Sequence, residues 1–289
     1  MGTIWELDFY SRPILDENGK KLWEVAICES PMTTMRSPDS LFRYAKYCPS
    51  NTVNSVWLSE AITEAIAQAP NPPTKVRFFR RQMNNMITKA CKDLGIDARL
   101  GRRTIALNHW LNDRMAQVYP QEPNYQESAI TTATVRYQAQ NPKRLPDAVQ
   151  GQKWAFVNLD ASAFADMADW EIGFEEGFPL ELAGIDENAV IPGAIVFSPR
   201  SLPLAGWMSG LELGFLKFDD RSRPRLLLET GADESWILAD LVGTQTQTEA
   251  KGFEEKKQSA NGVHFLAVQS DPNAQSFAGF WLLQELNLG

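Results

Sequence analysis

The stretch WELDFYSRPILDENGKKLWEVAICE, residues 5–29, decides how the first part of the chain folds. Large apolar residues alternate with polar ones over residues 5–9, and apolar residues recur at every second position over 23–27. A period of two is typical of a strand that buries one face. The sequence DENG at 16–19 lies between the two runs, and Asn and Gly accept the positive φ that a tight reversal needs. The stretch therefore predicts a long β-hairpin.

The residues after the hairpin predict helices and a further strand, and 41–47 stays open between a short helix and a strand. A helix begins near Asn54 or Ser55, either of which can cap it, and a second helix over 84–94 is closed by a glycine. Between them, 75–81 predicts a strand, and a third helix runs through 107–111. Hairpin, helix, strand and helix predict an α/β domain with a mixed sheet. The element order is loosely similar to that of ribonuclease H-like or restriction-nuclease-like domains.

The chain length of 289 residues favours two domains. We predict a basic N-terminal α/β domain over 1–116 and a connector over 117–150, which is rich in Gln, Pro, Asn and Tyr. An acidic C-terminal α/β domain over 151–289 follows, and we expect each domain to hold a mixed β-sheet flanked by helices. A hairpin, a helix and a strand recur near the end of the chain, so a duplicated unit stays open.

The charge of the chain is divided unequally. The net charge is −8, which argues against a protein that coats nucleic acid by bulk charge. Residues 1–150 hold 19 Lys and Arg against 15 Asp and Glu, or +4, whereas 151–289 hold 9 against 21, or −12. Such asymmetry suggests different partners for the two parts. The acidic part would repel RNA and suits a protein partner or a dimer contact.

Several classes of site and location find little support. Three cysteines without paired spacing predict a reducing compartment, and two distant histidines without a CxxC motif give no zinc site. The glycines form neither GxGxxG nor a phosphate-binding loop, so we expect no cofactor. No apolar run reaches the roughly 18 residues of a membrane span. The chain enters its first strand almost at once, without a signal or transit segment, which predicts a cytoplasmic protein.

The segment 75–103 is the strongest candidate for contact with RNA. It carries nine basic residues against two acidic ones, or +7, and Phe79 lies among the arginines of the predicted strand. Cations neutralise phosphates, and an exposed aromatic ring can stack on an unpaired base. From charge alone, a solvated basic face is the more common outcome, and a phenylalanine is more often part of a core. The candidate RNA-binding residues are Lys75, Arg77, Phe79, Arg80, Arg81, Lys89, Arg102 and Arg103.

The hairpin also carries carboxylates, which raise the alternative of a magnesium-dependent nuclease. Glu6 and Asp8 share one face of the first strand, and Glu24 or Glu29 could approach from the second. No E-x-K motif follows the second strand, however. Solvent-facing strand acids, or partners for Arg12 and Lys21, would explain these residues without a metal. We therefore expect no catalytic residues and no enzymatic activity.

The sequence resembles the Tab/Atab family of RNA-binding translation factors of cyanobacteria and chloroplasts. The resemblance is carried by WELDFYSRPILDENGKKLWEV (5–25), GRRTIALNHWL (101–111), LPDAVQGQKWAF (145–156), LPLAGWMSGLEL (202–213), LLLETGADESWILADL (226–241), GVHFLAVQS (262–270) and GFWLLQEL (279–286). It covers nearly the whole chain, and motifs of this length are specific.

The resemblance implies a function. A chain of this family would bind an AU-rich, single-stranded mRNA leader and promote the translation or biogenesis of photosystem I reaction-centre proteins. Its plant and algal relatives would work in the chloroplast stroma. With the resemblance, RNA contact through 75–103 becomes the favoured interpretation of the basic segment. A protein-only photosystem assembly factor and a nuclease stay open as alternatives, and so does a homodimer.

Overall fold

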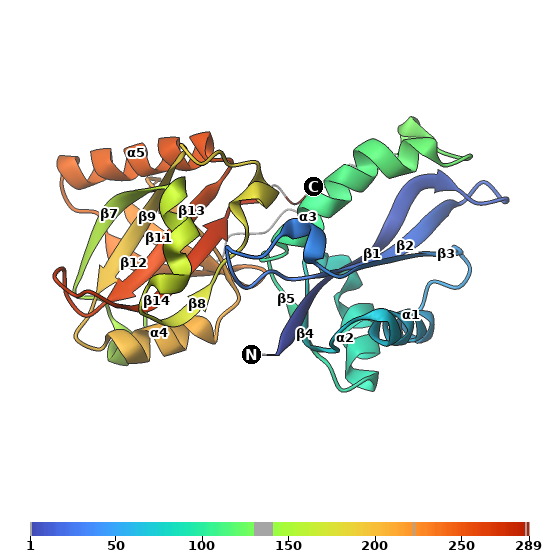
Figure 1. Cartoon of the computed structure of the whole chain (residues 1–289), viewed down its shortest axis with the longest axis horizontal. Helices are drawn as coiled ribbons and strands as arrows, with labels where there is room; N and C mark the ends of the chain where they lie inside the picture. The colour runs from blue at the N-terminus through green and yellow to red at the C-terminus, as the bar shows by residue number, and fades with distance from the viewer. Residues whose placement is uncertain (1, 130–140, 222, 287, 289) are drawn as a thin grey trace. The chain divides into compact units, whose positions relative to one another are not determined.

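The computed structural model describes residues 2–129, 141–221, 223–286 and 288, and the chain divides into two compact units (Figure 1). Unit 1 comprises Met1–Ser30, Asp39–Arg136 and Asn287–Gly289, and unit 2 comprises Pro31–Pro38 and Tyr137–Leu286. Part of the predicted connector, residues 130–140, lies outside the described residues. Each unit is mixed α/β, which confirms the predicted fold class.

Unit 1 is built on a five-stranded mixed sheet in the order β3-β2-β1-β4-β5. Its strands are β1 (Thr3–Leu15), β2 (Lys21–Glu29), β3 (Arg43–Cys48), β4 (Pro73–Phe78) and β5 (Asp97–Leu100). The predicted hairpin is confirmed, because β1 and β2 pair antiparallel. In its turn the carboxylate of Asp16 accepts the N–H groups of Asn18 and Lys20 at 2.9 Å each, and Gly19 takes φ +71°. β4 and β5 join in parallel through helical crossovers.

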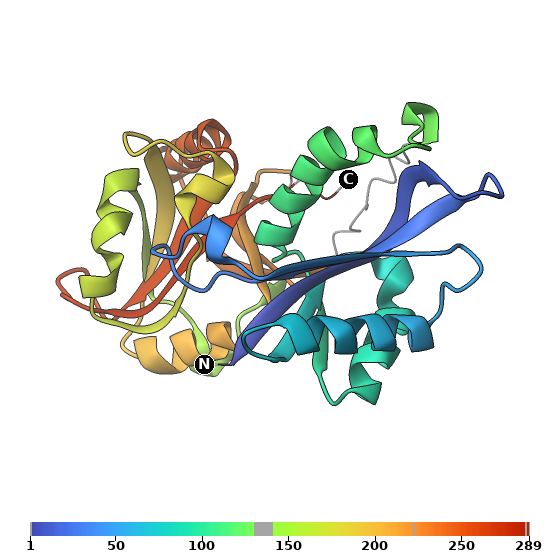
Figure 2. The same ribbon diagram turned by 45° about the vertical axis from the view of Figure 1, so that its right-hand side comes forward.

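Helices cover both faces of this sheet (Figures 1 and 2). The helices are α1 (Ser55–Gln68), α2 (Asn84–Asp93) and α3 (Ile105–Asp113), followed by the π-helical turn η3 (Arg114–Val118) and the 3-10 turn η4 (Tyr119–Gln121). Asn54 caps α1 by accepting two backbone N–H groups at 2.9 Å. The buried stripes of α1 and α2 pack on the sheet face that carries Trp5, Leu7 and Phe9. α3 contacts β1 and β2 from the other side.

The second face of β1 is therefore buried as well. Glu6 and Asp8 are only 1% exposed, although the alternation predicts a half-buried strand. The interpretation of these two residues as solvent-facing acids is wrong, because α3 and the turns after it cover them.

Unit 2 holds two mixed sheets. A five-stranded sheet has the order β7-β9-β13-β14-β8, and a four-stranded sheet has the order β10-β11-β12-β6. Their strands are β6 (Lys143–Arg144), β7 (Lys153–Asp160), β8 (Ile172–Glu176), β9 (Val190–Phe197), β10 (Leu213–Asp219), β11 (Arg225–Thr230), β12 (Glu234–Asp240), β13 (Val263–Gln269) and β14 (Phe277–Gln284). Apolar residues of both sheets join one core, to which Val196, Leu228 and Leu266 belong.

The helices of unit 2 close this core. They are α4 (Ser201–Ser209) and α5 (Thr244–Ser259). α4, which lies in the motif LPLAGWMSGLEL (202–213), buries Leu204, Ala205 and Met208. These residues of the motif therefore pack in the core of unit 2. The hairpin β11–β12 and strand β13 belong to different sheets, and the recurring hairpin–helix–strand order does not reproduce the sheet of unit 1. Within the described ranges, the structure has no helix that is both long and apolar enough to cross a membrane.

The cap of α1 gives a test of the fold. Asn54→Ala removes the acceptor for two N–H groups at the helix start, and we expect it to lower the free energy of unfolding by about 1 kcal/mol. Chemical denaturation measures the change. Thr63→Ala, on the exposed side of the same helix, is the matched control, and we expect it to change stability by less than about 0.5 kcal/mol. Equal effects of the two variants would contradict the assigned cap.

Candidate nucleic-acid interface

The polar face of the unit 1 sheet is a buried network of carboxylates and arginines. Asp8 lies at its centre: one carboxylate oxygen accepts Arg80 Nε at 2.7 Å and the other accepts Arg12 Nη1 at 3.0 Å. Burial acts to raise the pKa of Asp8, but the two guanidinium groups outweigh it and hold that pKa below its usual value. Arg80 also lies 4.1 Å from the centre of the Tyr10 ring, which fixes its side chain from a second direction.

Glu24, on β2, extends the network toward the turns that follow α3. Its carboxylate accepts Arg12 Nε at 2.8 Å, the Tyr119 hydroxyl at 2.5 Å, and an N–H of Arg114. Arg12 thus bridges Glu24 and Asp8 from β1. Burial raises the pKa of Tyr119, and the neighbouring Glu24 raises it further, so this hydroxyl stays a hydrogen-bond donor.

Glu6 occupies the end of the network next to α3. Its two oxygens accept the Ser30 hydroxyl at 2.7 Å and the backbone N–H of Leu107 at 2.8 Å. Burial raises the pKa of Glu6 to about 7, against the opposing effect of these hydrogen bonds and of Arg77 and Arg103. Glu6 is therefore a buried carboxyl group whose charge changes near neutral pH.

The structure places most of the predicted RNA-binding residues inside this fold. Five side chains are between 2 and 8% exposed, namely Arg77, Phe79, Arg80, Arg102 and Arg103. The guanidinium of Arg80 lies 4.7 Å from the centre of the Phe79 ring. The expectation of an exposed aromatic ring among the arginines is wrong for this conformation, because Phe79 is buried directly after the end of β4. Arg77 lies beside Glu6 of the neighbouring strand β1.

The remaining candidates are accessible to different degrees. Lys89, on α2, has a side chain that is 61% exposed and pairs with Asp93 at 2.9 Å, whereas Lys75 and Arg81 are half-buried. Two further cations of the same segment, Lys92 and Arg99, are exposed and were not among the candidates. Exposed ion pairs contribute little to the stability of the fold. A phosphate can therefore compete with the carboxylate partner of such an exposed cation.

The carboxylates that raised the nuclease alternative are bound by protein donors. Asp8 and Glu24 accept hydrogen bonds from arginines, and Glu6 accepts hydrogen bonds from a hydroxyl and a backbone N–H. Among the described residues, no group of three or more His, Cys, Asp or Glu side chains is placed to hold a metal ion. The alternative interpretation of these acids as partners for Arg12 is confirmed for Asp8 and Glu24. This geometry does not favour the nuclease.

Family comparison identifies both parts of the chain. Residues 4–114 match the model described as RNA-binding protein Tab2/Atab2 N terminal, and residues 132–284 match the C-terminal domain of the same protein. The chain belongs to the RNA-binding Tab2/Atab2 family. The resemblance seen in the sequence is thereby confirmed.

Two plant relatives match over almost the whole chain. The chloroplastic protein TAB2 homolog of Arabidopsis thaliana is 39% identical over 98% of this chain and 74% of its own length. The chloroplastic homolog of Zea mays is 38% identical over 98% of this chain and 71% of its own length. Both relatives therefore contain sequence beyond the part that this chain matches.

Likeness to solved structures is weak. A chain of the simian T-cell lymphotropic virus intasome in complex with PP2A regulatory subunit B56 gamma aligns with a TM-score of 0.33 and 13% identity, over 54% of this chain and 62% of that one. The HTLV-2 integrase catalytic core domain in complex with magnesium aligns with a TM-score of 0.26 and 14% identity, over 42% of this chain and 76% of that one.

The raised pKa of Glu6 predicts a pH-dependent stability. The folded protein holds a proton on Glu6 that the unfolded chain releases near its ordinary pKa of 4.5. The free energy of unfolding should therefore fall as pH rises from about 5 to about 8, by up to about 3 kcal/mol from this group. Denaturation of Glu6→Gln across the same pH range should lack this part of the decline. An identical pH profile for the two proteins would contradict the assignment.

The ion pair at Asp8 predicts that Arg80 supports the fold. Arg80→Ala leaves a buried carboxylate short of a partner, so we expect a loss of about 3 to 5 kcal/mol in the free energy of unfolding. Lys89→Ala, which removes an exposed cation of the same segment, should change it by less than about 1 kcal/mol. Urea denaturation of both variants measures these changes. An Arg80→Ala variant as stable as the wild-type protein would contradict a stabilising role of the network.

Proposed function

We propose that this chain binds single-stranded RNA and that the accessible cations of unit 1 neutralise its phosphates. Membership of a family described as RNA-binding, matched over both parts of the chain, carries the proposal. Counterion release by lysines and arginines supplies most of the affinity in such complexes. The cations of the segment 75–103 that reach solvent are Lys75, Lys89, Lys92 and Arg99, whereas Nε and Nη2 of Arg81 are buried.

The buried arginines have a different role in this proposal. Arg77 and Arg103 act on the carboxyl group of Glu6, and Arg80 pairs with Asp8, so we assign these buried arginines to the stability of unit 1 and not to RNA contact. Arg102 is buried as well. A substitution of Arg80 that abolishes RNA binding would therefore report loss of the fold. Exposed cations give the interpretable test.

The biological role is proposed from the resemblance. The bound RNA would be an AU-rich mRNA leader, and binding would promote translation or biogenesis of photosystem I reaction-centre proteins without catalysis by this chain. Both plant relatives are described as chloroplastic, whereas a cytoplasmic location of this chain stays a prediction. A protein partner on the acidic part and a homodimer also stay predictions.

A salt series on an AU-rich single strand, without magnesium, tests the proposal. Affinity should fall steeply with salt, and the variant Lys89→Ala/Lys92→Ala/Arg99→Ala should bind more weakly. Its log–log slope should be shallower by about 2, which is roughly 0.7 for each lost phosphate contact. Fluorescence anisotropy of a labelled strand measures both quantities.

A charge-matched variant separates local contact from bulk charge. Lys217→Ala/Lys251→Ala/Lys256→Ala removes three exposed cations of unit 2 and should leave affinity and slope nearly unchanged. Wild-type protein without salt-dependent binding would overturn the proposal and favour the protein-only assembly factor. RNA cleavage that requires magnesium would support the nuclease instead.

A further inference from the structure

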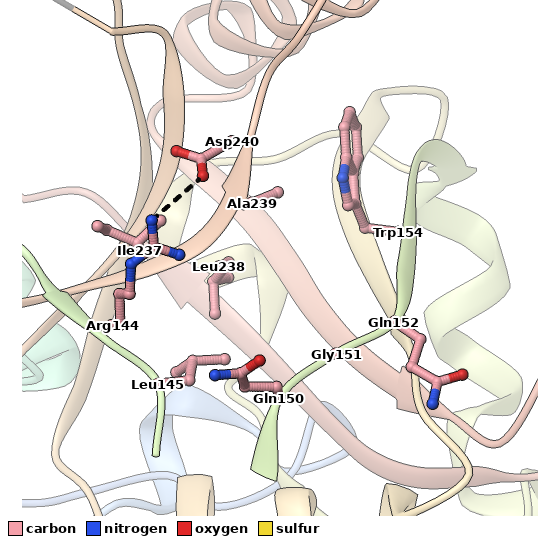
Figure 3. A pocket seen from close by; sticks show the side chains of 10 residues that line it. All are labelled: Arg144, Leu145, Gln150, Gly151, Gln152, Trp154, Ile237, Leu238, Ala239 and Asp240. Carbon is pink, nitrogen blue, oxygen red and sulfur yellow. Dashed lines mark ion pairs between the residues drawn. The ribbon is translucent and has the colours of Figure 1, made fainter. Parts of the chain in front are cut away.

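A small polar pocket lies in unit 2 between the end of β12 and the beginning of β7. Its volume is about 230 Å³. Figure 3 shows Arg144 and Asp240 on one side of it and Trp154 on the other, with Leu145 and Leu238 between them. This volume is below the usual range for drug-sized ligands and suits a fragment such as one planar base.

Strand pairing and backbone contacts hold the residues that line this pocket. β6 pairs in parallel with β12, which places Arg144 opposite Ile237. A side chain at Gly151 would come within 2.4 Å of Val196, so the backbone passes close to β9 there. The next backbone N–H, that of Gln152, donates to the Phe197 carbonyl at 2.9 Å. The pocket is therefore a fixed feature of the fold.

Positive charge gathers around Asp240 at one side of the pocket, where Arg144 lines the pocket and two further arginines lie next to it. Three arginines surround the single carboxylate of Asp240: Arg223 at 3.2 Å, Arg225 at 3.3 Å and Arg144 at 3.8 Å. One negative charge among three positive ones leaves a local charge of +2. The side chains of Arg144 and Arg223 are 67 and 55% exposed, so both can reach an incoming anion. Arg223 and Arg225 thus lie, together with Arg144 of the predicted connector, in a locally basic cluster next to the acidic part of the chain.

The other side offers an oriented aromatic ring. Trp154 is half-buried, and its indole meets Phe156 edge-on at 5.3 Å and 71°. Phe156 in turn stacks on Phe253 of α5 at 5.2 Å, which anchors the pair to the core. The exposed amide groups of Gln150 and Gln152 lie at the same pocket. Amides can form hydrogen bonds with the edge of a base.

We propose that this pocket takes one unstacked base of a single-stranded RNA, with Arg144 and Arg223 on the adjoining phosphate. An aromatic ring for stacking, amides for the base edge and guanidinium groups for the phosphate are the parts that single-strand recognition uses. The inference rests on the proposed RNA-binding function, and it adds a base-contacting site in unit 2 to the phosphate-contacting cations of unit 1.

The test uses the full chain and an AU-rich RNA of ten nucleotides that contains 2-aminopurine. Stacking on an indole quenches the fluorescence of this base, and anisotropy of an end label gives the affinity of the same strand. We expect wild-type protein to quench 2-aminopurine on binding. Trp154→Leu should lose the quenching and weaken binding roughly 10- to 100-fold, the range for one base–aromatic stack.

Two arginine variants distinguish loss of the pocket contact from misfolding. Arg144→Ala alters a largely exposed side chain and should weaken binding and reduce the salt slope by about 0.7. Arg221→Ala, whose side chain is 69% exposed and pairs with Asp219 outside the pocket, should behave like wild type. Circular dichroism and thermal denaturation confirm that each variant is folded.

The outcomes separate the pocket from the proposed function. Tight, salt-dependent RNA binding without quenching, unchanged in Trp154→Leu and Arg144→Ala, would overturn the pocket and leave RNA binding through unit 1 in place. Absence of RNA binding by wild-type protein would overturn both. Quenching that is lost in Trp154→Leu and kept in Arg221→Ala would support the site.

Discussion

The pairing of buried carboxylates with buried arginines is the constraint on which unit 1 depends. Asp8 and Glu24 lie on neighbouring strands, and Arg12 donates to both carboxylates. Arg80 donates to Asp8 as well, and Arg114 donates to Glu24. Removing two charges from water is unfavourable unless each finds partners of good geometry. α3 can cover this side of the sheet only because the network satisfies these groups. The polar layer therefore specifies how the chain after β5 returns to the sheet.

This constraint changes what the charge of the sequence means for function. The segment 75–103 carries +7, yet four of its arginines are at most 8% exposed. Conversely, 151–289 carries −12, but its Arg223 and Arg225 gather with Arg144 around the single carboxylate of Asp240. Affinity for RNA thus depends on which cations reach solvent, and both units present some.

Periodicity predicted the hairpin and the first two helices, but it did not predict β5 and placed the end of β4 at residue 81, whereas the strand ends at Phe78. The hairpin, α1 and α2 follow directly from alternation, from the cap at Asn54 and from the glycine after residue 94. A period of two identifies the two faces of β1, but it does not reveal that a later helix buries the second face. Tyr119, a partner of Glu24, falls in the predicted connector, where no periodic signal marks it. The pocket at Trp154 joins segments nearly 90 residues apart in the chain, beyond the reach of local patterns.

The most direct test of the account is to map where bound RNA touches the chain. An AU-rich strand that carries 4-thiouridine is cross-linked to the full protein, and the modified peptides are identified by mass spectrometry. We expect cross-links on the exposed part of α2 and β5 and at Trp154. Cross-links confined to Phe79, Arg80 and Arg102–Arg103 would contradict it, since those side chains would then have to leave the interior to bind RNA.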